Sequence, residues 1–213
     1  IKKRLSKELP FRDHKISICL HVEAKSAIWI ETLMAGGAEV AITGSPGSTQ
    51  DDTAAYMVSE MGVEVFSWRS ENYEEHMDNA KRVLNARPTI IADNGGDLHF
   101  LLAEDGDYKA LSTSTIGATE ETTTGANRLR EELPPFDFPT VIINDTMAKR
   151  IVENRYGVGI SVVDGIMRST NIMLGGKLIV VVGYGYCGQG IAQRLRGLGA
   201  RVTVVDSAPM AQL

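Results

Sequence analysis

Short apolar runs alternate with longer segments of helical spacing along most of the chain. The runs typical of strands cover residues 15–20, 39–43, 63–68, 88–92, 141–143, 178–182 and 202–205. The segments with helical spacing of apolar residues cover 26–35, 52–61, 71–86, 146–155, 160–174 and 190–198. Because strands that alternate with helices form crossover units, this order predicts an α/β fold with a mostly parallel, doubly wound sheet.

Local signals refine two of these elements. Gly62 follows the segment 52–61, where a left-handed residue is expected to end the helix. The run at 178–182 (LIVVV) has no polar break, so it predicts a strand buried on both faces.

The organisation of the chain changes near residues 144–160, where a polar, mixed-charge helix separates two series of strands and helices. We therefore expect one domain at 1–150, a hinge at about 144–158 and a second domain at 159–213. The second domain holds only one complete strand-turn-helix-strand unit. Since a dinucleotide-binding domain normally has two such halves, we expect only its first half here.

Composition narrows the class of protein. The chain has 213 residues, of which 43% are hydrophobic and 23% charged, as in globular domains. The net charge of −5 argues against a nucleic-acid partner. The sequence shows neither a long apolar span nor a signal-peptide pattern, so we expect no membrane partner and a cytoplasmic location. Cys19 and Cys187 are expected as unpaired core or turn residues.

A dinucleotide fingerprint follows the strand at 178–182. Gly183, Gly185 and Gly188 form G-x-G-x-x-G, with Tyr186 and Cys187 between the last two glycines, and Asp206 ends the next strand. Glycines at these positions permit the tight turn, the approach of backbone to a pyrophosphate and close helix packing. A carboxylate after the second strand suits ribose hydroxyls and disfavours a 2′-phosphate, so NAD is expected rather than NADP. The motif alone excludes neither FAD nor a glycine-rich turn without a nucleotide.

Polar clusters follow the strand-like runs, where open parallel sheets place their sites. They cover residues 21–25, 48–52, 93–97 and 120–125, and Asn144-Asp145 with Lys149, Glu153 and Asn154. Lys149 and Glu153 are four residues apart, so they share one helical face. Taken alone, this spacing is more typical of a surface ion pair than of a catalytic site, and the acid-threonine run at 120–125 is also typical of a helix N-cap.

These motifs, in this order, resemble those of S-adenosylhomocysteine hydrolases. The resemblance rests on STQDD, on GGD after an acidic strand end, on EETTTG and on the stretch ND…K…N-x-Y-G. The segment GYGYCGQGIAQRLRGLGARV is similar to that family's NAD fingerprint, and the resemblance extends from about Pro10 to the end. It implies a substrate-binding domain at 1–150, the start of a Rossmann NAD-binding domain at 159–213, and a homotetramer in the methionine cycle.

The resemblance also implies a reaction. The 3′-hydroxyl of the nucleoside is oxidised by tightly held NAD, a base removes the acidified C4′ proton, and homocysteine leaves from C5′. Water then adds, and the ketone is reduced again, which yields adenosine and homocysteine. The order is chemically sound because a hydrogen next to a carbonyl is within reach of a modest base.

The resemblance assigns roles to individual residues. Lys149 is the expected base at the 3′-hydroxyl, with Glu153 and Asn154 as its neighbours, and His21 is expected near C5′. The substrate is expected to meet Glu23, Lys25, Ser48, Gln50 and Glu121. NAD is expected to contact Thr122, Thr123, Thr124, Gly183, Gly185, Tyr186, Cys187, Gly188 and Asp206. No metal is expected.

The sequence departs from the family pattern at three points. Asn94 stands where the family commonly has a catalytic Asp, and Glu153 stands where it has a shorter Asp. Glu23-x-Lys25 replaces Thr-x-Glu, and Lys25 offers only hydrogen-bond donors to the base. A donor suits the O6 carbonyl of hypoxanthine, so S-inosylhomocysteine is an alternative substrate.

Two further alternatives remain open from the sequence. Asn94 is also consistent with a catalytically impaired homologue that binds nucleoside or NAD. A 2-hydroxyacid-dehydrogenase-like oxidoreductase, which releases NADH, has a similar domain order. The chain as given is expected to be inactive by itself, since half of the dinucleotide-binding domain is not in it.

Overall fold

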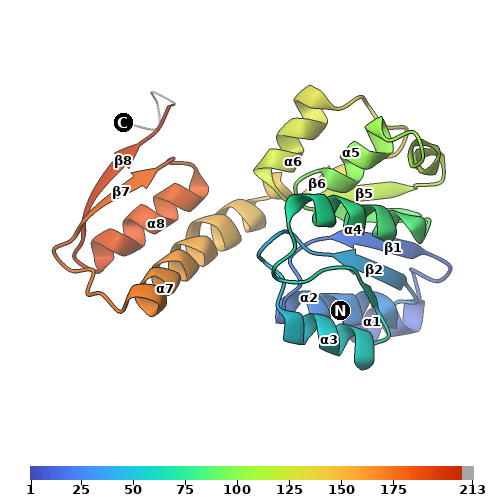
Figure 1. Ribbon diagram of the computed structural model, residues 1–213, viewed down its shortest axis with the longest axis horizontal. Helices are drawn as coiled ribbons and strands as arrows, with labels where there is room; N and C mark the ends of the chain where they lie inside the picture. The colour runs from blue at the N-terminus through green and yellow to red at the C-terminus, as the bar shows by residue number, and fades with distance from the viewer. Residues whose placement is uncertain (208–213) are drawn as a thin grey trace. The chain divides into compact units, whose positions relative to one another are not determined.

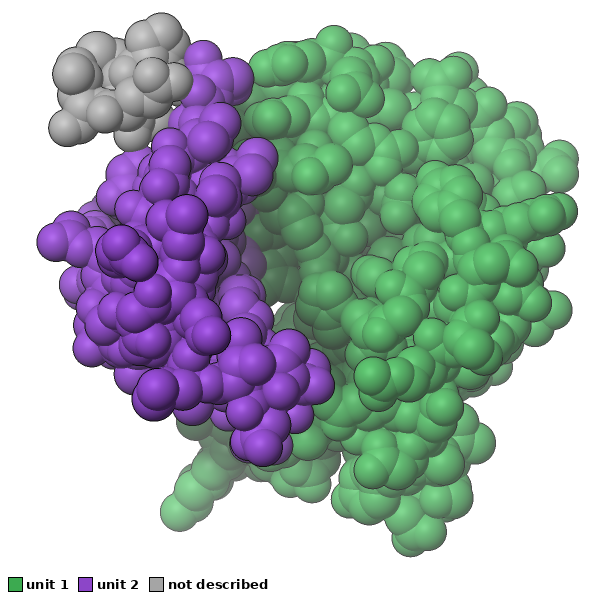
Figure 2. Space-filling model, turned by 60° about the vertical axis from the view of Figure 1, so that its left-hand side comes forward, with its two compact units in different colours: residues 1–143 green, residues 144–213 purple. Residues whose placement is uncertain are grey.

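The computed structural model describes residues 1–207 and separates the chain into two compact units, residues 1–143 and 144–213 (Figure 2). Along the chain, the boundary between the two structural units lies between residues 143 and 144. The functional boundary at residue 150, with its hinge at 144–158, stays a prediction. No helix among the described residues has the length and apolar character needed to cross a bilayer.

Six of the described strands form one parallel sheet in the first unit, in the order β3-β2-β1-β4-β5-β6 (Figure 1). They are β1 (Lys15–Cys19), β2 (Glu39–Thr43), β3 (Glu64–Val65), β4 (Ile90–Asp93), β5 (Gly117–Glu120) and β6 (Thr140–Ile142). The chain reverses its direction of travel across the sheet between β1 and β4. In a doubly wound sheet the loops after these two strands diverge there and leave a crevice for ligands.

One helix precedes β1, and the other helices of this unit connect the strands. The helices are α1 (Lys2–Glu8), α2 (Ala24–Ala35), α3 (Asp51–Ser59), α4 (Tyr73–Asn85), α5 (Asp97–Glu104) and α6 (Thr123–Asn127). A 3-10 turn at Lys109–Thr113 follows α5, and a π-helical turn at Arg128–Glu132 continues α6. Asn72 opens α4 with a capping box, because its side chain accepts from Glu75 N while the Glu75 side chain accepts from Asn72 N.

Strand alternation divides the core of the first unit into two apolar clusters. On one face Ile18 and Ile42, both fully buried, pack with Ile30 of α2. On the other face Cys19 and Leu84 of α4 belong to a second cluster with residues of α5. Full burial of each large aliphatic side chain stabilises the fold by about 1.5–3 kcal/mol, so the sheet is held from both sides.

The second unit is built on a pair of parallel strands. Its elements are a 3-10 turn (Ile143–Asp145) shared with the first unit, a π-helix (Ala148–Gly157), α7 (Val158–Thr170), β7 (Leu178–Val182), α8 (Tyr186–Gly197) and β8 (Arg201–Val205). Glycines let the helices meet closely: a Cβ at Gly159 would lie 2.7 Å from the carbonyl carbon of Gly190, and a Cβ at Gly190 would overlap the carbonyl oxygen of Arg155.

The prediction that residues 178–182 are buried on both faces is wrong for the described structure. Leu178 is 72% exposed and Val182 is 83% exposed, whereas Val181 is buried. The reason is that the sheet of this unit has two strands within residues 144–207, so β7 has one strand neighbour and one covered face. The apolar run of β7 is typical of a strand that is buried on both faces, but the described residues of this unit do not bury it.

Several elements differ from their predicted form. The run at 63–68 forms a strand only at Glu64–Val65. The sequence did not predict α5, β5 or α6, which all lie between residues 97 and 127. The remaining predicted strands and helices are present with shifts at their ends.

Candidate functional site

The loop after β1 carries the first predicted cluster. Ser26 Oγ donates to the carbonyl of His21 at 2.5 Å, which fixes the turn between β1 and α2. His21 is exposed and lies two residues after the end of β1. Glu23 occupies the N-cap position of α2, and its carboxylate forms an ion pair with Lys25 Nζ at 3.1 Å. Two of the residues that depart from the family pattern, Glu23 and Lys25, therefore contact each other at the start of one helix.

The loop after β2 is anchored by a buried chain of hydrogen bonds. The hydroxyls of Thr49 and Ser67 lie 2.5 Å apart, and Ser67 Oγ donates to Glu71 Oε1 at 2.8 Å. Asn79 Nδ2 donates to the other oxygen of Glu71 at 2.8 Å. This chain of hydrogen bonds holds Thr49 between the predicted substrate residues Ser48, which is half-buried, and Gln50, which is exposed.

The carboxyl ends of β1 and β4 come together at the reversal point of the sheet. Asn94 Nδ2 lies 3.4 Å from His21 Nε2, so the amide donates to the ring nitrogen. The preceding Asp93 is buried and accepts from Asn94 N at 3.0 Å, from His99 N at 3.0 Å and from His99 Nδ1 at 2.8 Å. Two residues predicted from separate motifs, His21 and Asn94, are thus neighbours in the structure.

A charged cluster supports the loop after β4. Asp97 accepts from Arg128 Nη1 at 2.9 Å and lies 3.1 Å from His76 Nε2. Burial by itself would raise the pKa of Asp97, but the hydrogen bonds and positive charges of His76 and Arg128 outweigh it and lower the pKa. Arg128 also donates to the carbonyl of Gly95 at 2.7 Å, so an ionised Asp97 stabilises the loop that carries Asn94.

The acid-threonine run follows β5. Thr122 is the N-cap of α6, where its Oγ1 accepts from Gly125 N at 2.8 Å. Glu121 N donates to the carbonyl of Asp93 at 3.1 Å, which places Glu121 beside the end of β4. The helix-cap role of this run and its predicted site role are therefore compatible.

Lys149, Glu153 and Asn154 lie in the π-helix of the second unit. Lys149 Nζ and Glu153 Oε1 form an ion pair, as the four-residue spacing predicts. A π-helix hydrogen-bonds residues five apart, which is the spacing of Lys149 and Asn154, so Asn154 also lies one turn from the lysine. Helices of this kind are rare in proteins, and those that occur are often found at functional sites.

The glycine turn after β7 has the geometry of a phosphate-binding loop. Gly183 has a φ of +93°, which only glycine adopts without strain. A Cβ at Gly188 would overlap the carbonyl oxygen of Gly183, so helix α8 approaches the turn only because residue 188 is glycine. Gly185 is the N-cap of α8, and Tyr186 and Cys187 form its first turn, where backbone amides bind anions.

Two side chains complete this turn. Asp206 Oδ2 accepts from Tyr184 N at 2.5 Å, which ties the end of β8 to the glycine turn. Burial raises the pKa of the Cys187 thiol, so this side chain is uncharged at neutral pH. A Cβ at Gly185 would meet no described atom within 4 Å, so the open space at Gly185 and the amides at the start of α8 fit a dinucleotide pyrophosphate.

The structure places the predicted residues in two groups, one in each unit. His21, Asn94 and Glu121 lie at the carboxyl edge of the six-stranded sheet, with Ser48 and Gln50 on the next loop. Lys149, Glu153 and Asn154 lie on the π-helix, and the glycines lie at the start of α8. The sequence predicted no role in the site for the groups that hold the first set, which are the buried Glu120 and His99 and the partly buried Arg128. The glycine five residues after Glu120 was the available signal.

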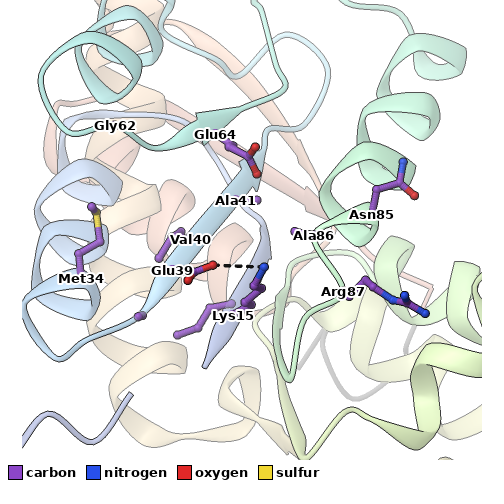
Figure 3. Close-up of a pocket in the computed structure, with 12 residues that line it drawn as sticks. Lys15, Met34, Glu39, Val40, Ala41, Gly62, Glu64, Asn85, Ala86 and Arg87 are labelled. Atoms are coloured by element: carbon purple, nitrogen blue, oxygen red, sulfur yellow. Dashed lines mark ion pairs between the residues drawn. The ribbon is translucent and has the colours of Figure 1, made fainter. Parts of the chain in front are cut away.

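A cavity of about 570 Å³ lies at the opposite edge of the first unit's sheet (Figure 3). It is lined by the amino ends of β1 and β2, by β3 and by the end of α4, with Lys15 Nζ and Glu39 Oε2 paired at 3.3 Å. The catalytic and binding residues predicted from the sequence are not among its lining residues.

Both units match models of known protein families. Residues 1–105 match the family model of S-adenosyl-L-homocysteine hydrolase, and residues 154–213 match that of the NAD binding domain of S-adenosyl-L-homocysteine hydrolase. NAD is therefore the cofactor of the second unit, in agreement with the geometry of its glycine turn.

Relatives of two names match along the chain. An S-inosyl-L-homocysteine hydrolase of Methanopyrus kandleri is 50% identical over 215 residues, which are 99% of this chain and 50% of the relative. An adenosylhomocysteinase of Sulfurisphaera tokodaii is 47% identical over 216 residues, 100% of this chain and 51% of the relative. The chain thus spans about half the length of the curated relatives it matches. Through both family models and these relatives, the chain belongs to the S-adenosyl-L-homocysteine hydrolase family.

Proposed function

We propose that the intact protein is an NAD-dependent hydrolase that converts S-adenosylhomocysteine to adenosine and homocysteine. The observation that carries the proposal is the pairing of two features in one chain. A glycine turn suited to NAD follows a doubly wound unit in which His21, Asn94 and Glu121 lie at the sheet reversal. Such a reversal is where open α/β sheets bind their ligands.

In this proposal the side chains of the first unit bind the nucleoside. Glu121 accepts hydrogen bonds from the ribose hydroxyls, and His21 lies near C5′, where the thiol leaves and water adds. Asn94, 3.4 Å from His21 Nε2, orients the imidazole but has no proton to exchange. Ser48 and Gln50 line the same site.

The second unit supplies the redox step and its base. Held by the glycine turn at 183–188, NAD would supply reversible hydride transfer at the 3′ carbon. Lys149, as the neutral amine, takes the proton of the 3′-hydroxyl, and the ammonium that forms pairs with Glu153, which fixes where Nζ lies. Asn154 positions Lys149 and the cofactor, and Thr122, Thr123 and Thr124 contact the cofactor from the first unit. Asp206 binds the adenosine ribose of NAD.

A second candidate substrate, S-inosylhomocysteine, is favoured by one observation. Glu23 and Lys25 form an ion pair at the start of α2 in place of the common Thr-x-Glu. A lysine donates to the O6 carbonyl of hypoxanthine, whereas the exocyclic amine of adenine needs an acceptor. Relatives of similar identity carry both names.

The test compares thiol release from the two thioethers by the intact protein. The proposal expects turnover of S-adenosylhomocysteine, and Lys25→Ala to change kcat/KM less than tenfold. A preference of tenfold or more for the inosyl compound, abolished by Lys25→Ala, establishes the second candidate instead. Absence of thiol release from both compounds overturns the proposed function. Lys7→Ala, in the exposed part of α1, is the matched control.

The proposal also covers the oligomeric state of the intact protein and its location in the cell. We infer that the intact protein is a cytoplasmic homotetramer that acts in the methionine cycle, as the family resemblance implies. Light scattering of the purified intact protein tests the assembly, and a monomeric mass contradicts it.

A further inference from the structure

Glu120, the last residue of β5, has a fully buried side chain at the edge of the sheet that carries the site. Its Oε1 accepts three hydrogen bonds: from Thr122 N at 2.7 Å, from Thr122 Oγ1 at 2.9 Å and from Gly95 N at 3.1 Å. Two of these partners belong to the start of α6, and the third belongs to the loop after β4. One carboxyl group therefore joins two segments that are about 25 residues apart in the sequence.

Gly125 makes room for this carboxyl group. A Cβ at residue 125 would overlap the carboxyl carbon and both oxygens of Glu120. Gly125 does not have a positive φ, so its backbone does not require glycine. The limited space beneath α6 requires glycine, because any side chain at 125 displaces the Glu120 carboxyl group.

The two segments joined by Glu120 each carry a predicted site residue. Asp93 and Glu120 are register partners in the β4–β5 pair, so Asn94 and Glu121 are the next residues on neighbouring strands. Glu121 N also donates to the carbonyl of Asp93. If Glu120 releases Gly95 and Thr122, the relative placement of Asn94 and Glu121 loses three hydrogen bonds and depends more on that backbone bond and on the hydrogen bond from Arg128 to the carbonyl of Gly95.

A cation does not explain this arrangement better. Asp93, His99 and Glu120 bring potential ligand atoms within 4.8 Å of one another. However, both Asp93 oxygens already accept N–H groups, and His99 Nδ1 lies 2.8 Å from Asp93 Oδ2, the geometry of a hydrogen bond. Burial, and secondarily the charge of Asp93, raise the pKa of Glu120, so a proton on Glu120 relieves the excess negative charge.

We propose that Glu120 is a positioning residue of the nucleoside site, which holds Asn94 and Glu121 in register by fastening the β4 loop to the start of α6. The inference rests on the proposed function, because it takes Asn94 and Glu121 to face the substrate. Glu120 itself does not touch the substrate. It acts only through the two segments that it joins.

The test uses the intact protein with Glu120→Gln, Glu120→Ala and the control Glu104→Gln, an exposed glutamate at the end of α5. Glutamine keeps a carbonyl oxygen for the three hydrogen bonds, so kcat is expected within threefold of the parent. Alanine removes all three bonds, so kcat for thioether hydrolysis is expected to fall at least tenfold. KM should change less than threefold, because misplacement of reacting groups affects mainly the chemical step. If kcat is kept with glutamine and lost with alanine, Glu120 acts by positioning and its negative charge is not required.

A second readout does not depend on the reaction. Hydrogen exchange of peptides that contain Gly95 and Thr122 should accelerate at least tenfold in Glu120→Ala, and remain as in the parent in Glu120→Gln and Glu104→Gln. Unchanged exchange together with unchanged kcat in the alanine variant overturns the inference. Accelerated exchange in a protein that releases no thiol overturns the proposed function and leaves the structural link standing.

A further variant, Gly125→Ala, tests the same link while the Glu120 side chain is kept. Gly125→Ala should displace the Glu120 carboxyl group and accelerate the same exchange. In that background, Glu120→Ala should then add less than a twofold effect, because the link is already broken. Independent, multiplicative effects of the two substitutions contradict the proposal.

Discussion

Replacing Gly188 by alanine is expected to weaken NAD binding by displacing the glycine turn. The added Cβ would lie 2.9 Å from the carbonyl carbon of Gly183 and overlap its oxygen. Carbon atoms are in contact at about 3.5 Å, so the turn and α8 must separate by about 0.6 Å or more. Both neighbours are backbone, so no side-chain rotation relieves the clash.

The size of the effect follows from hydrogen-bond geometry. N–H···O bonds extend to about 3.2 Å, so a shift of this size is enough to break one amide–phosphate bond. A hydrogen bond to a charged group contributes about 1.5–3 kcal/mol. At about 1.4 kcal/mol per factor of ten, NAD affinity should fall about 10- to 100-fold. Overpacking should also lower the free energy of unfolding by about 1–3 kcal/mol.

Calorimetric titration of NAD into the cofactor-free intact protein measures the affinity, and Gly197→Ala is the matched control. Gly197 ends the same helix, is exposed, and no described atom beyond its own helix would lie within 4 Å of an added Cβ. This control should keep the NAD affinity and gain up to about 1 kcal/mol of stability. An NAD affinity within twofold of the parent in Gly188→Ala would refute the reasoning.

Three further predictions test other parts of the structure. The pKa of Glu120 is raised in the folded protein. The free energy of unfolding of the parent relative to Glu120→Gln should therefore be greatest below about pH 4.3 and decline as pH rises through the raised pKa. A difference in the free energy of urea unfolding that stays constant from acid to neutral pH contradicts this. Asn94→Asp places a carboxylate beside His21, so kcat for hydrolysis should rise at least tenfold, and an unchanged rate favours an impaired homologue. Ile42→Ala should cost about 2–5 kcal/mol in denaturant unfolding, whereas the exposed Val58→Ala should stay within about 0.5 kcal/mol; equal costs contradict the assigned core.

The sequence predicted best those elements whose pattern is local. The strands at 39–43 and 178–182 have the predicted bounds, because uninterrupted apolar or β-branched runs define them. The four-residue strand β5 (GATE) contains a glycine and a buried glutamate, so its pattern gives no apolar signal. Helix α5 begins after Gly95 and Gly96, both with positive φ, and glycines of this kind are also typical of a loop.

Burial and site support depend on neighbours that a single sequence does not specify. The apolar run of β7 predicted burial, but the strand has only β8 beside it within the described residues. The glycine turn at 183–188 could be predicted because all of its geometry lies within six residues. The hydrogen bonds from Gly95 N to Glu120 and from His99 to Asp93 require the register of β4 against β5 and the start of α5, which become known only in three dimensions.

Simultaneous measurement of thiol release and reduced nicotinamide during turnover tests the central claim most directly. With S-adenosylhomocysteine as substrate and NAD bound to the intact protein, we predict homocysteine release over many turnovers with no net accumulation of NADH, since the hydride is returned in each cycle. NADH that accumulates in proportion to product, or an NAD-loaded protein that releases no thiol, would contradict the account.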